Sequence, residues 1–587
     1  MPAYPIEYTY NEMTDDIIIT KYIDTDKTHT EYIIPSMIDN KKVTSIANNA
    51  FENCTHLIDL ILPDTITSIG DHAFDGCAKL KNINLPNSII SIGDNAFSYC
   101  HSLIEINIPD SVISIGCEAF SNCNRLDMVP LPKSLLIINN GLFKNCVQLS
   151  EIKIPQNVLE IGCEAFLGCS SILEIKLPES TIKIDDKAFS LCRNLMRVNL
   201  PKQIQVIEER TFEMCIRLGK IDIPSSVHTI KNRAFNGCTN LGQLHIPNSV
   251  THIGSRAFSG CRRLLKVTLP RKITELGNNV FADCSKLLQI NIPENITAIK
   301  DGFLKECNNL TEVHIPGCVE YIGDEAFYSC SKIKRINIPD RVDYIGHWAF
   351  SGCYGIKQIY IPSNVTSIGY GAFYECKELT EVSLPDSIET LGGGLFSECR
   401  KLSKVILRNT GEKKVEFREL IHEIKLPLEI NFYNQEAEEN VFVAVPKSMF
   451  ADEAHYESYT TIFKLNDNKY EIDFKWYDAH FAFINDKDAQ ITVLISRIPY
   501  QKSWSQAALT QYRDFAAQNS YDVIIEIIKK YTVPRLKDLC ALTEVIDEQN
   551  INDFIEYANK NKRADFISFL LDYKATHFQY HKKKYDL

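Results

Sequence analysis

The apolar residues of this chain recur with a period of 23 residues over most of its length. Aligned on the motif Ala-Phe-x-x-Cys, sixteen cysteines lie 23 residues apart without insertion or deletion. The position three before the cysteine is Phe in every repeat except one, which has Leu304, and the position nine after it is Pro in every repeat except the last, which has Arg408. A period this strict predicts a solenoid. The repeat cysteines are Cys54, Cys77, Cys100, Cys123, Cys146, Cys169, Cys192, Cys215, Cys238, Cys261, Cys284, Cys307, Cys330, Cys353, Cys376 and Cys399.

One repeat, PNSVTHIGSRAFSGCRRLLKVTLP at residues 247–270, shows the expected elements. Val267 and Leu269 alternate with the polar Lys266 and Thr268, as in a short strand with one buried face. The proline that follows ends the strand because it has no N–H to donate. A second short extended segment leads to a glycine, such as Gly254 in this repeat, which we expect to supply a bend. The Ala-Phe-x-x-Cys segment is then a short helical or 3₁₀ turn that buries the Phe.

The repeat pattern L-x-x-I-x-I-P-x-S-V-x-x-I-G-x-x-A-F-x-x-C resembles the BspA-like class of leucine-rich repeat, over roughly residues 33–407. The resemblance implies a β-rich, right-handed solenoid of about 16 coils with the I-x-I strands in one parallel sheet. It also implies a surface or adhesion protein that binds other proteins.

The segments outside the repeats complete four expected domains. Residues 1–40 alternate like strands and should form an N-terminal cap, and residues 41–407 are the leucine-rich repeats. Residues 408–505, including QITVLISRI, are interpreted as a β-rich domain. Residues 506–587 have helical periodicity, and the last helix pair weakly resembles an ankyrin repeat, which suggests a capping or docking module.

The repeated cysteines are interpreted as buried free thiols that fill the coil. Equivalent atoms of adjacent coils lie about 4.8 Å apart in a parallel sheet, but the parallel Cβ vectors are the wrong geometry for disulfides. The chain has no C-x-x-C pair of the kind that supplies structural zinc. Sixteen unpaired thiols favour a reducing compartment. The remaining cysteines, Cys117, Cys163, Cys318 and Cys540, have no evident partner in the sequence.

Charge and composition narrow the function further. The formal net charge of −12 gives no general attraction to nucleic acid or to anionic lipid. No apolar run approaches the length that spans a bilayer, and the N-terminus lacks the pattern of a Sec signal peptide. The sequence therefore predicts a cytoplasmic protein without a membrane span, with the cell surface or secretion as the alternative that the family resemblance implies.

Functional residues are expected at the variable positions of the repeat, because packing fixes the others. The outward positions of the I-x-I strands are polar, and they form either a ligand-binding face or an ordinary solvated one. The candidates for a binding face are Arg197, Lys220, His245, Lys266, His314 and Arg335.

Aromatic residues are concentrated in a second candidate site. Residues 41–317 contain one Tyr or Trp, Tyr99, whereas residues 318–376 contain eight. Tyr321 and Tyr344 occupy the same position in adjacent repeats, so they should stack. Tyr and Trp are enriched at the energetic centres of interfaces. Three interpretations remain open: a partner-binding patch, a surface on which the C-terminal region folds back, and sequence drift at exposed positions. The eight residues are Tyr321, Tyr328, Tyr344, Trp348, Tyr354, Tyr360, Tyr370 and Tyr374.

No motif for catalysis, for a phosphate-binding loop or for a metal site occurs in the sequence, so we expect neither an enzyme nor a cofactor nor a small-molecule substrate. The acidic residues Asp473, Asp478, Asp486 and Asp488 near His480 are interpreted as polar turns between strands. The leading hypothesis is a scaffold that binds a protein partner. The alternatives are a sensor or effector whose residues 408–587 signal or act, and an adhesin exported by a non-Sec route.

Overall fold

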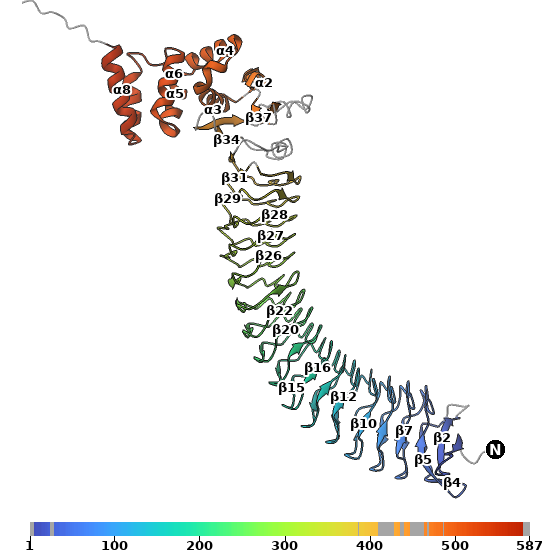
Figure 1. Cartoon of the computed structure of the whole chain (residues 1–587). Helices are drawn as coiled ribbons and strands as arrows, with labels where there is room; N and C mark the ends of the chain where they lie inside the picture. The colour runs from blue at the N-terminus through green and yellow to red at the C-terminus, as the bar shows by residue number, and fades with distance from the viewer. Residues whose placement is uncertain are drawn as a thin grey trace, which may run out of the picture. The chain divides into compact units, whose positions relative to one another are not determined.

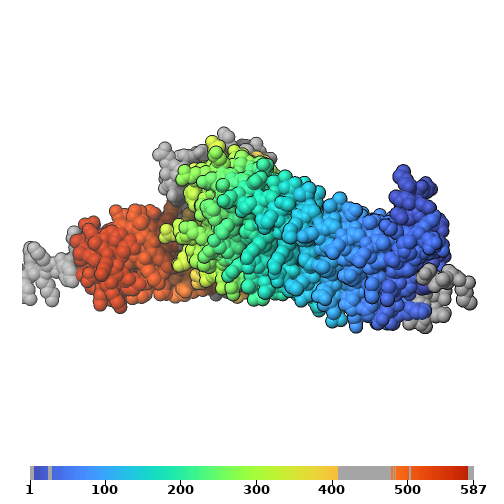
Figure 2. Space-filling model, turned by 90° about the horizontal axis from the view of Figure 1, so that it is seen from below, coloured from blue at the N-terminus to red at the C-terminus, as the bar shows by residue number. Residues whose placement is uncertain are grey.

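The computed structural model of the chain describes residues 5–23, 29–385, 387–408, 428–434, 439–445, 463–466, 469–472, 474–479, 481–484 and 486–578. They belong to two compact units, Met1–Gly355 and Ile356–Leu587. Unit 1 is built from coils of 23 residues that stack one on the next (Figure 1). We name each coil by its repeat cysteine. Neighbouring coils pack closely along the face seen in Figure 2.

Each coil of unit 1 carries up to two short strands, and from β6 and β5 onward the paired strands of each row are parallel, with residues 23 apart as partners, such as Lys220 with Gln243. The first row is divided into separate short sheets instead of one continuous sheet. The first-strand row consists of β3 (Glu31–Ile33), β6 (Asp59–Ile61), β8 (Asn82–Asn84), β11 (Met128–Pro130), β13 (Glu151–Lys153), β15 (Glu174–Lys176), β17 (Arg197–Asn199), β19 (Lys220–Asp222), β21 (Gln243–His245), β23 (Lys266–Thr268) and β25 (Gln289–Asn291).

The second-strand row follows the proline of each coil. At its start, β1 (Ile6–Tyr10) and β2 (Ile17–Tyr22) form an antiparallel hairpin, β2 pairs in parallel with β5, and β4 (Met37–Ile38) pairs with β5 antiparallel. The row continues with β5 (Lys41–Ile46), β7 (Ser68–Ile69), β9 (Ser91–Ile92), β10 (Ser114–Ile115), β12 (Ile137–Ile138), β14 (Glu160–Ile161), β16 (Lys183–Ile184), β18 (Val206–Ile207), β20 (Thr229–Ile230), β22 (His252–Ile253), β24 (Glu275–Leu276), β26 (Ala298–Ile299), β27 (Tyr321–Ile322) and β28 (Tyr344–Ile345).

The core of unit 1 contains a column of stacked phenylalanines. From Phe51 to Phe281, successive rings lie 5.1–5.7 Å apart between centroids. Where Leu304 replaces the repeated Phe, the preceding Phe303 occupies the Ala position and meets Phe281 edge-on, at 5.8 Å and 83°. Phe303 is fully buried, so the aromatic volume is retained in that coil.

The repeat cysteines form a second column, and they do more than fill space. In the series from Cys77 to Cys353, each thiol donates a hydrogen bond to the backbone carbonyl of the residue 26 positions earlier, which is the Phe of the preceding coil, or Leu304 in the case of Cys330. From Cys77 to Cys353 the Sγ–O distances are 3.0–3.5 Å. Burial raises the pKa of these thiols, to about 12 for Cys146 and Cys192.

Unit 2 begins with further repeats and continues into helices. One of its sheets has the strand order β29-β31-β33-β34-β35, in which the antiparallel hairpin β34–β35 pairs in parallel with the last repeat strand, β33. Its strands are β29 (Gln358–Tyr360), β30 (Ser367–Ile368), β31 (Glu381–Pro385), β32 (Thr390–Leu391), β33 (Lys404–Arg408), β34 (Leu428–Asn434), β35 (Glu439–Val445), β36 (Phe463–Asn466) and β37 (Lys469–Ile472). Its helices are α2 (Phe474–Ala479), η3 (Phe481–Phe483), α3 (Lys487–Arg497), η4 (Ile498–Ser503), α4 (Gln506–Gln518), α5 (Ser520–Lys530), α6 (Val533–Leu542), α7 (Ile551–Lys560) and α8 (Ala564–His577).

The strand expected for QITVLISRI is wrong, because this segment lies in the helix α3. Its compact run of apolar residues suits a buried helix as well as a buried strand. Asp486, expected in a turn, is the N-cap, and its carboxylate accepts a hydrogen bond from the Asp488 N–H. Asp473 and His480 lie outside the described residues, whereas Asp478 lies in α2 rather than in a polar turn.

Candidate functional site

The six charged candidates on the first-strand row lie on the outer surface as the alternation predicts, but they are spread along the array. Arg197, Lys220 and Lys266 are exposed at the start of β17, β19 and β23. Arg197 is the register partner of Glu174 in the neighbouring strand. The Lys220 ammonium lies 3.0 Å from Asp222 in its own strand. Surface pairs of this kind contribute little stability.

The other three candidates on this row do not converge on a common centre either. His245, in β21, is the register partner of Asp222, and the His314 imidazole lies 3.5 Å from the Glu294 carboxylate. Arg335 is exposed and, like His314, lies in a coil without a first strand. Within the described ranges, no group of His, Cys, Asp or Glu side chains is arranged to hold a metal ion.

Tyr321 and Tyr344 stack across adjacent coils of unit 1. Their ring centroids lie 5.0 Å apart, their planes differ by 4°, and both residues are half-buried at the outward position of β27 and β28. Burial, with a smaller contribution from the Asp301 carboxylate, raises the pKa of Tyr321 to about 12. Both hydroxyls therefore remain neutral hydrogen-bonding groups on a flat aromatic surface. We call these two residues the tyrosine pair.

The remaining aromatic candidates fall on several positions of the coil. In unit 1, the Lys305 ammonium lies 5.2 Å from the ring centroid of Tyr328, Trp348 adopts a positive φ of 57°, and Tyr354 is half-buried. In unit 2, Tyr360 and Tyr370 are exposed and Tyr374 is half-buried. A single patch that includes all eight residues stays a prediction.

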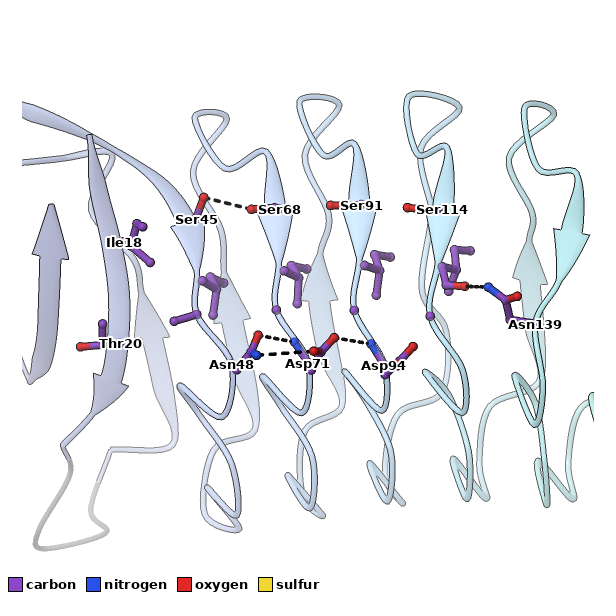
Figure 3. Close-up of a pocket in the computed structure, with 18 residues that line it drawn as sticks. Ile18, Thr20, Ser45, Asn48, Ser68, Asp71, Ser91, Asp94, Ser114 and Asn139 are labelled. Carbon is purple, nitrogen blue, oxygen red and sulfur yellow. Dashed lines mark hydrogen bonds between the residues drawn. The ribbon is translucent and has the colours of Figure 1, made fainter. Parts of the chain in front are cut away.

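A groove on the second-strand row of unit 1 was not expected from the sequence. It has a volume of about 840 Å³ and follows the first coils, from β2 to the coil of Cys146 (Figure 3). Its floor includes a column of serines, nine residues before the repeat cysteine: Ser45, Ser68, Ser91 and Ser114. Among the described residues, the ionisable side chains that line it are Asp71 and Asp94. The signal was visible in the aligned repeats as four successive serines at an outward position.

One side of the groove is held by a ladder of side chains that join adjacent coils. The side-chain oxygen of Asn48 accepts a hydrogen bond from the Asp71 N–H at 2.8 Å, and the Asp71 carboxylate accepts one from the Asp94 N–H at 2.8 Å (Figure 3). Equivalent bonds recur along unit 1, as from the Ser255 N–H to Asn232 and from the His347 N–H to Asp324. These carboxylates therefore have a structural role in addition to their charge.

The glycines next to this ladder lie where the backbones of neighbouring coils approach each other closely. Gly254, Gly277, Gly323 and Gly346 do not have a positive φ. A Cβ at Gly254 would instead lie 2.6 Å from the backbone nitrogen of Asn232, and the other three positions are equally crowded. Glycine is needed because neighbouring coils approach closely there.

Comparisons with known proteins identify the family. The family model "BspA type Leucine rich repeat region" matches residues 29–149, 137–241, 205–334 and 299–415, which together are more than half of the chain. The chain belongs to this family of leucine-rich repeat proteins, whose members are generally non-catalytic and bind proteins or act as adhesins.

Solved structures similar to this chain have the same kind of repeat. A leucine-rich repeat protein from Bacteroides ovatus is 26% identical, with a TM-score of 0.46, over 70% of this chain and 94% of the other. A leucine rich cell surface protein from Faecalibacterium prausnitzii is 24% identical, with a TM-score of 0.38, over the same shares. The T. pallidum leucine-rich repeat protein is 33% identical, with a TM-score of 0.28, over 37% of this chain and 90% of the other. No curated protein matches the sequence.

Proposed function

We propose that this chain is a non-catalytic scaffold that binds a protein partner through its solenoid surface. The observation that carries the proposal is the tyrosine pair. Two parallel rings, held by the rigid strands β27 and β28, present a flat apolar surface with two hydroxyls. Because the strands fix the rings before binding, little side-chain entropy is lost when a partner covers them.

The chemistry of the cysteines also supports a non-catalytic role. A nucleophilic cysteine needs a lowered pKa, whereas burial raises the pKa of repeat thiols such as Cys146 and Cys192. The variable surface positions are therefore left to carry function, as is typical of solenoids.

We place this scaffold in a reducing compartment, the cytoplasm. All cysteines of the chain are free thiols, and the off-register Cys117, Cys163 and Cys318 are partly accessible to solvent. In an oxidising space such thiols would be open to mixed disulfide formation. Separately, none of the described helices has the length and apolar character that crossing a membrane requires.

Affinity capture with the full-length protein tests the proposal. A Tyr321→Ala, Tyr344→Ala variant should lose partners that the native chain recovers, and Tyr321→Phe, Tyr344→Phe should keep most of them because the stack is retained. A control variant, Tyr99→Ala, removes an exposed tyrosine from a distant coil of the same unit. Recovery of the same partners in equal amounts by all four proteins would exclude the tyrosine pair as the binding site.

A further inference from the structure

Five exposed aliphatic side chains lie in a row on the second-strand side of unit 1. They occupy the position ten residues before the repeat cysteine in five consecutive coils, and they are 40–62% exposed. We call them the aliphatic ridge: Ile90, Ile113, Leu136, Leu159 and Ile182.

The other coils show that packing does not require an aliphatic residue at this position. All eleven remaining repeats have a polar residue there: Thr44, Thr67, Gln205, His228, Thr251, Thr274, Thr297, Glu320, Asp343, Thr366 and Glu389. Since apolar residues are confined to one continuous run, the ridge is a local surface feature and not part of the repeat. Contiguous exposed apolar surface of this kind marks interaction sites.

The ridge borders the groove. Ile90 and Ile113 directly precede Ser91 and Ser114 in the groove floor. The backbone N–H of Ile113 donates to the Ile90 carbonyl, and that of Ile182 donates to the Leu159 carbonyl. Successive ridge residues are therefore one coil apart, about 4.8 Å, and the whole ridge is about 19 Å long.

This spacing fits an α-helix that lies along the array better than it fits an extended strand. A helix presents one apolar residue per turn of about 5.4 Å, which is close to the coil spacing. In an extended strand, residues on one face are about 6.8 Å apart and lose register with the ridge after two coils. About 13 helical residues, at about 1.5 Å each, would cover the ridge.

The groove adds a preference for charge. The Asp71 and Asp94 carboxylates line it, and its lining contains no Lys, Arg or His side chain from the part of the chain that the structure describes. The hydroxyls of Ser91 and Ser114 form no hydrogen bond within the described part of the chain, so they are open to a partner's polar groups. Asp94 lies in the same coil as Ile90 and Asp71 lies one coil before it, so a helix seated on the ridge would gain from basic residues near the end that covers Ile90.

A second copy of this chain is a poorer occupant. The five side chains expose apolar surface on the order of 400 Å², whereas a stable interface buries about 800 Å² on each partner. A single amphipathic helix needs only the smaller area, and helices often dock with one apolar stripe in a groove.

We propose that the aliphatic ridge and the adjoining groove bind an amphipathic α-helix of a protein partner, with its apolar stripe on the ridge and basic residues facing Asp71 and Asp94. The proposal goes beyond the function that the tyrosine pair carries, and it stands or falls independently of that pair.

A designed peptide tests the fit. The probe is a fluorescein-labelled helical peptide of about 18 residues, with leucines at i, i+4, i+7 and i+11 and lysines near one end. The first control is a peptide of the same composition with the leucines moved off the stripe. The second is an alternating Leu/Lys peptide, which favours an extended strand. The third is the probe peptide with Glu in place of each Lys. Fluorescence anisotropy with the full-length protein should show binding of the probe at least about tenfold tighter than of each control. Equal binding of the extended or shuffled peptide would overturn the proposal.

Matched variants locate the site. Ile113→Thr, Leu136→Thr introduces the residue that other coils carry at this position, and it should weaken probe binding by about tenfold or more. The control Leu265→Thr, Leu288→Thr alters two equally exposed aliphatic residues elsewhere on unit 1, and it should bind the probe as the native protein does. Thermal melts of all variants should agree to within a few degrees, which would exclude misfolding.

Asp71→Asn, Asp94→Asn removes the charge and keeps the hydrogen-bond acceptors, as Asn48 does at the same position. It should weaken probe binding several-fold at low salt and make binding less dependent on salt. Unchanged binding to Ile113→Thr, Leu136→Thr would overturn the proposal. The proposal would also be overturned if the native protein sedimented as a dimer and Ile113→Thr, Leu136→Thr sedimented as a monomer, because a second copy of the chain would then cover the ridge.

Discussion

Gly93 illustrates how closely the backbones of adjacent coils approach. It lies between Ile92 and Asp94 in the groove, and a Cβ placed on it would be 2.5 Å from the Asp71 carboxylate oxygen and 2.6 Å from the Asp71 nitrogen. The same Asp71 carboxylate oxygen accepts the hydrogen bond from the Asp94 N–H. The glycine, the carboxylate and the backbone amide therefore form one interlocked contact.

We expect Gly93→Ala to destabilise the protein by about 1–3 kcal/mol, because the added methyl must displace the Asp71 ladder contact. Gly219→Ala is the matched control, since a Cβ there meets nothing within 4 Å. Urea denaturation followed by circular dichroism measures both variants. Equal urea midpoints for the two variants would contradict this expectation, because they would show that adjacent coils can separate slightly without loss of stability.

At the scale of the element, the first helices of unit 2 are joined by a buried polar cluster. The Arg497 guanidinium, at the end of α3, donates to both Asp478 carboxylate oxygens of α2 at 2.8 and 2.9 Å. The Tyr512 hydroxyl of α4 donates to the same carboxylate at 2.9 Å, and the Tyr477 hydroxyl donates to the Ala444 carbonyl of β35. The cluster ties three helices together, and the neighbouring Tyr477 ties them to the hairpin β34–β35.

Removing one partner of a buried ion pair leaves the other charge uncompensated, so Asp478→Ala should destabilise the helical part by about 3–5 kcal/mol. Tyr512→Phe loses a single hydrogen bond to a charged group and should cost about 1.5–3 kcal/mol. The control Asp572→Ala, at an exposed position of α8, should change little. Denaturant unfolding monitored by tryptophan fluorescence distinguishes these outcomes, and a cost for Asp478→Ala no larger than for the control would contradict this role of the cluster.

Elements of the repeat could be predicted from the sequence because sixteen copies average out the ambiguity of each one. The single α3 segment offered no such averaging, and its short apolar run matched strand and helix equally well. The thiol ladder and the glycine contacts depend on distances between coils, which one repeat does not reveal. The groove and the ridge were present in the sequence as runs of serine and of aliphatic residues at one repeat position, but their exposure needed the structure.

At the scale of the whole molecule, the buried thiols together make the free energy of unfolding depend on pH. Below about pH 9 the thiols are neutral in both the folded and the unfolded chain, and their contribution is fully present. Above that pH, thiols of the unfolded chain ionise, whereas burial keeps folded thiols such as Cys146, Cys192 and Cys353 neutral up to about pH 12. Stability is therefore lost as pH rises through this window.

Each such thiol should lower the free energy of unfolding by about 1.4 kcal/mol per pH unit above about pH 9. We predict a steep fall in Tm between about pH 9 and pH 11. In a Cys146→Ala, Cys192→Ala, Cys353→Ala variant the fall should be shallower, although the variant is less stable at neutral pH. Thermal melts of both proteins across this range measure the difference, and parallel curves would rule out the thiols as its cause.

The fixed register of 23 residues also has a consequence for the gene. The hydrogen bonds of the thiol ladder join residues 26 apart, those of the Asn/Asp ladder join residues 23 apart, and paired repeat strands of unit 1 such as β19 and β21 also join residues 23 apart. A recombination event that adds or removes one whole repeat in frame therefore regenerates the same contacts at the new junction, whereas the loss of part of a repeat misaligns all of them. Array length is consequently free to change during evolution in whole-coil steps, while the cross-section of the coil is held constant.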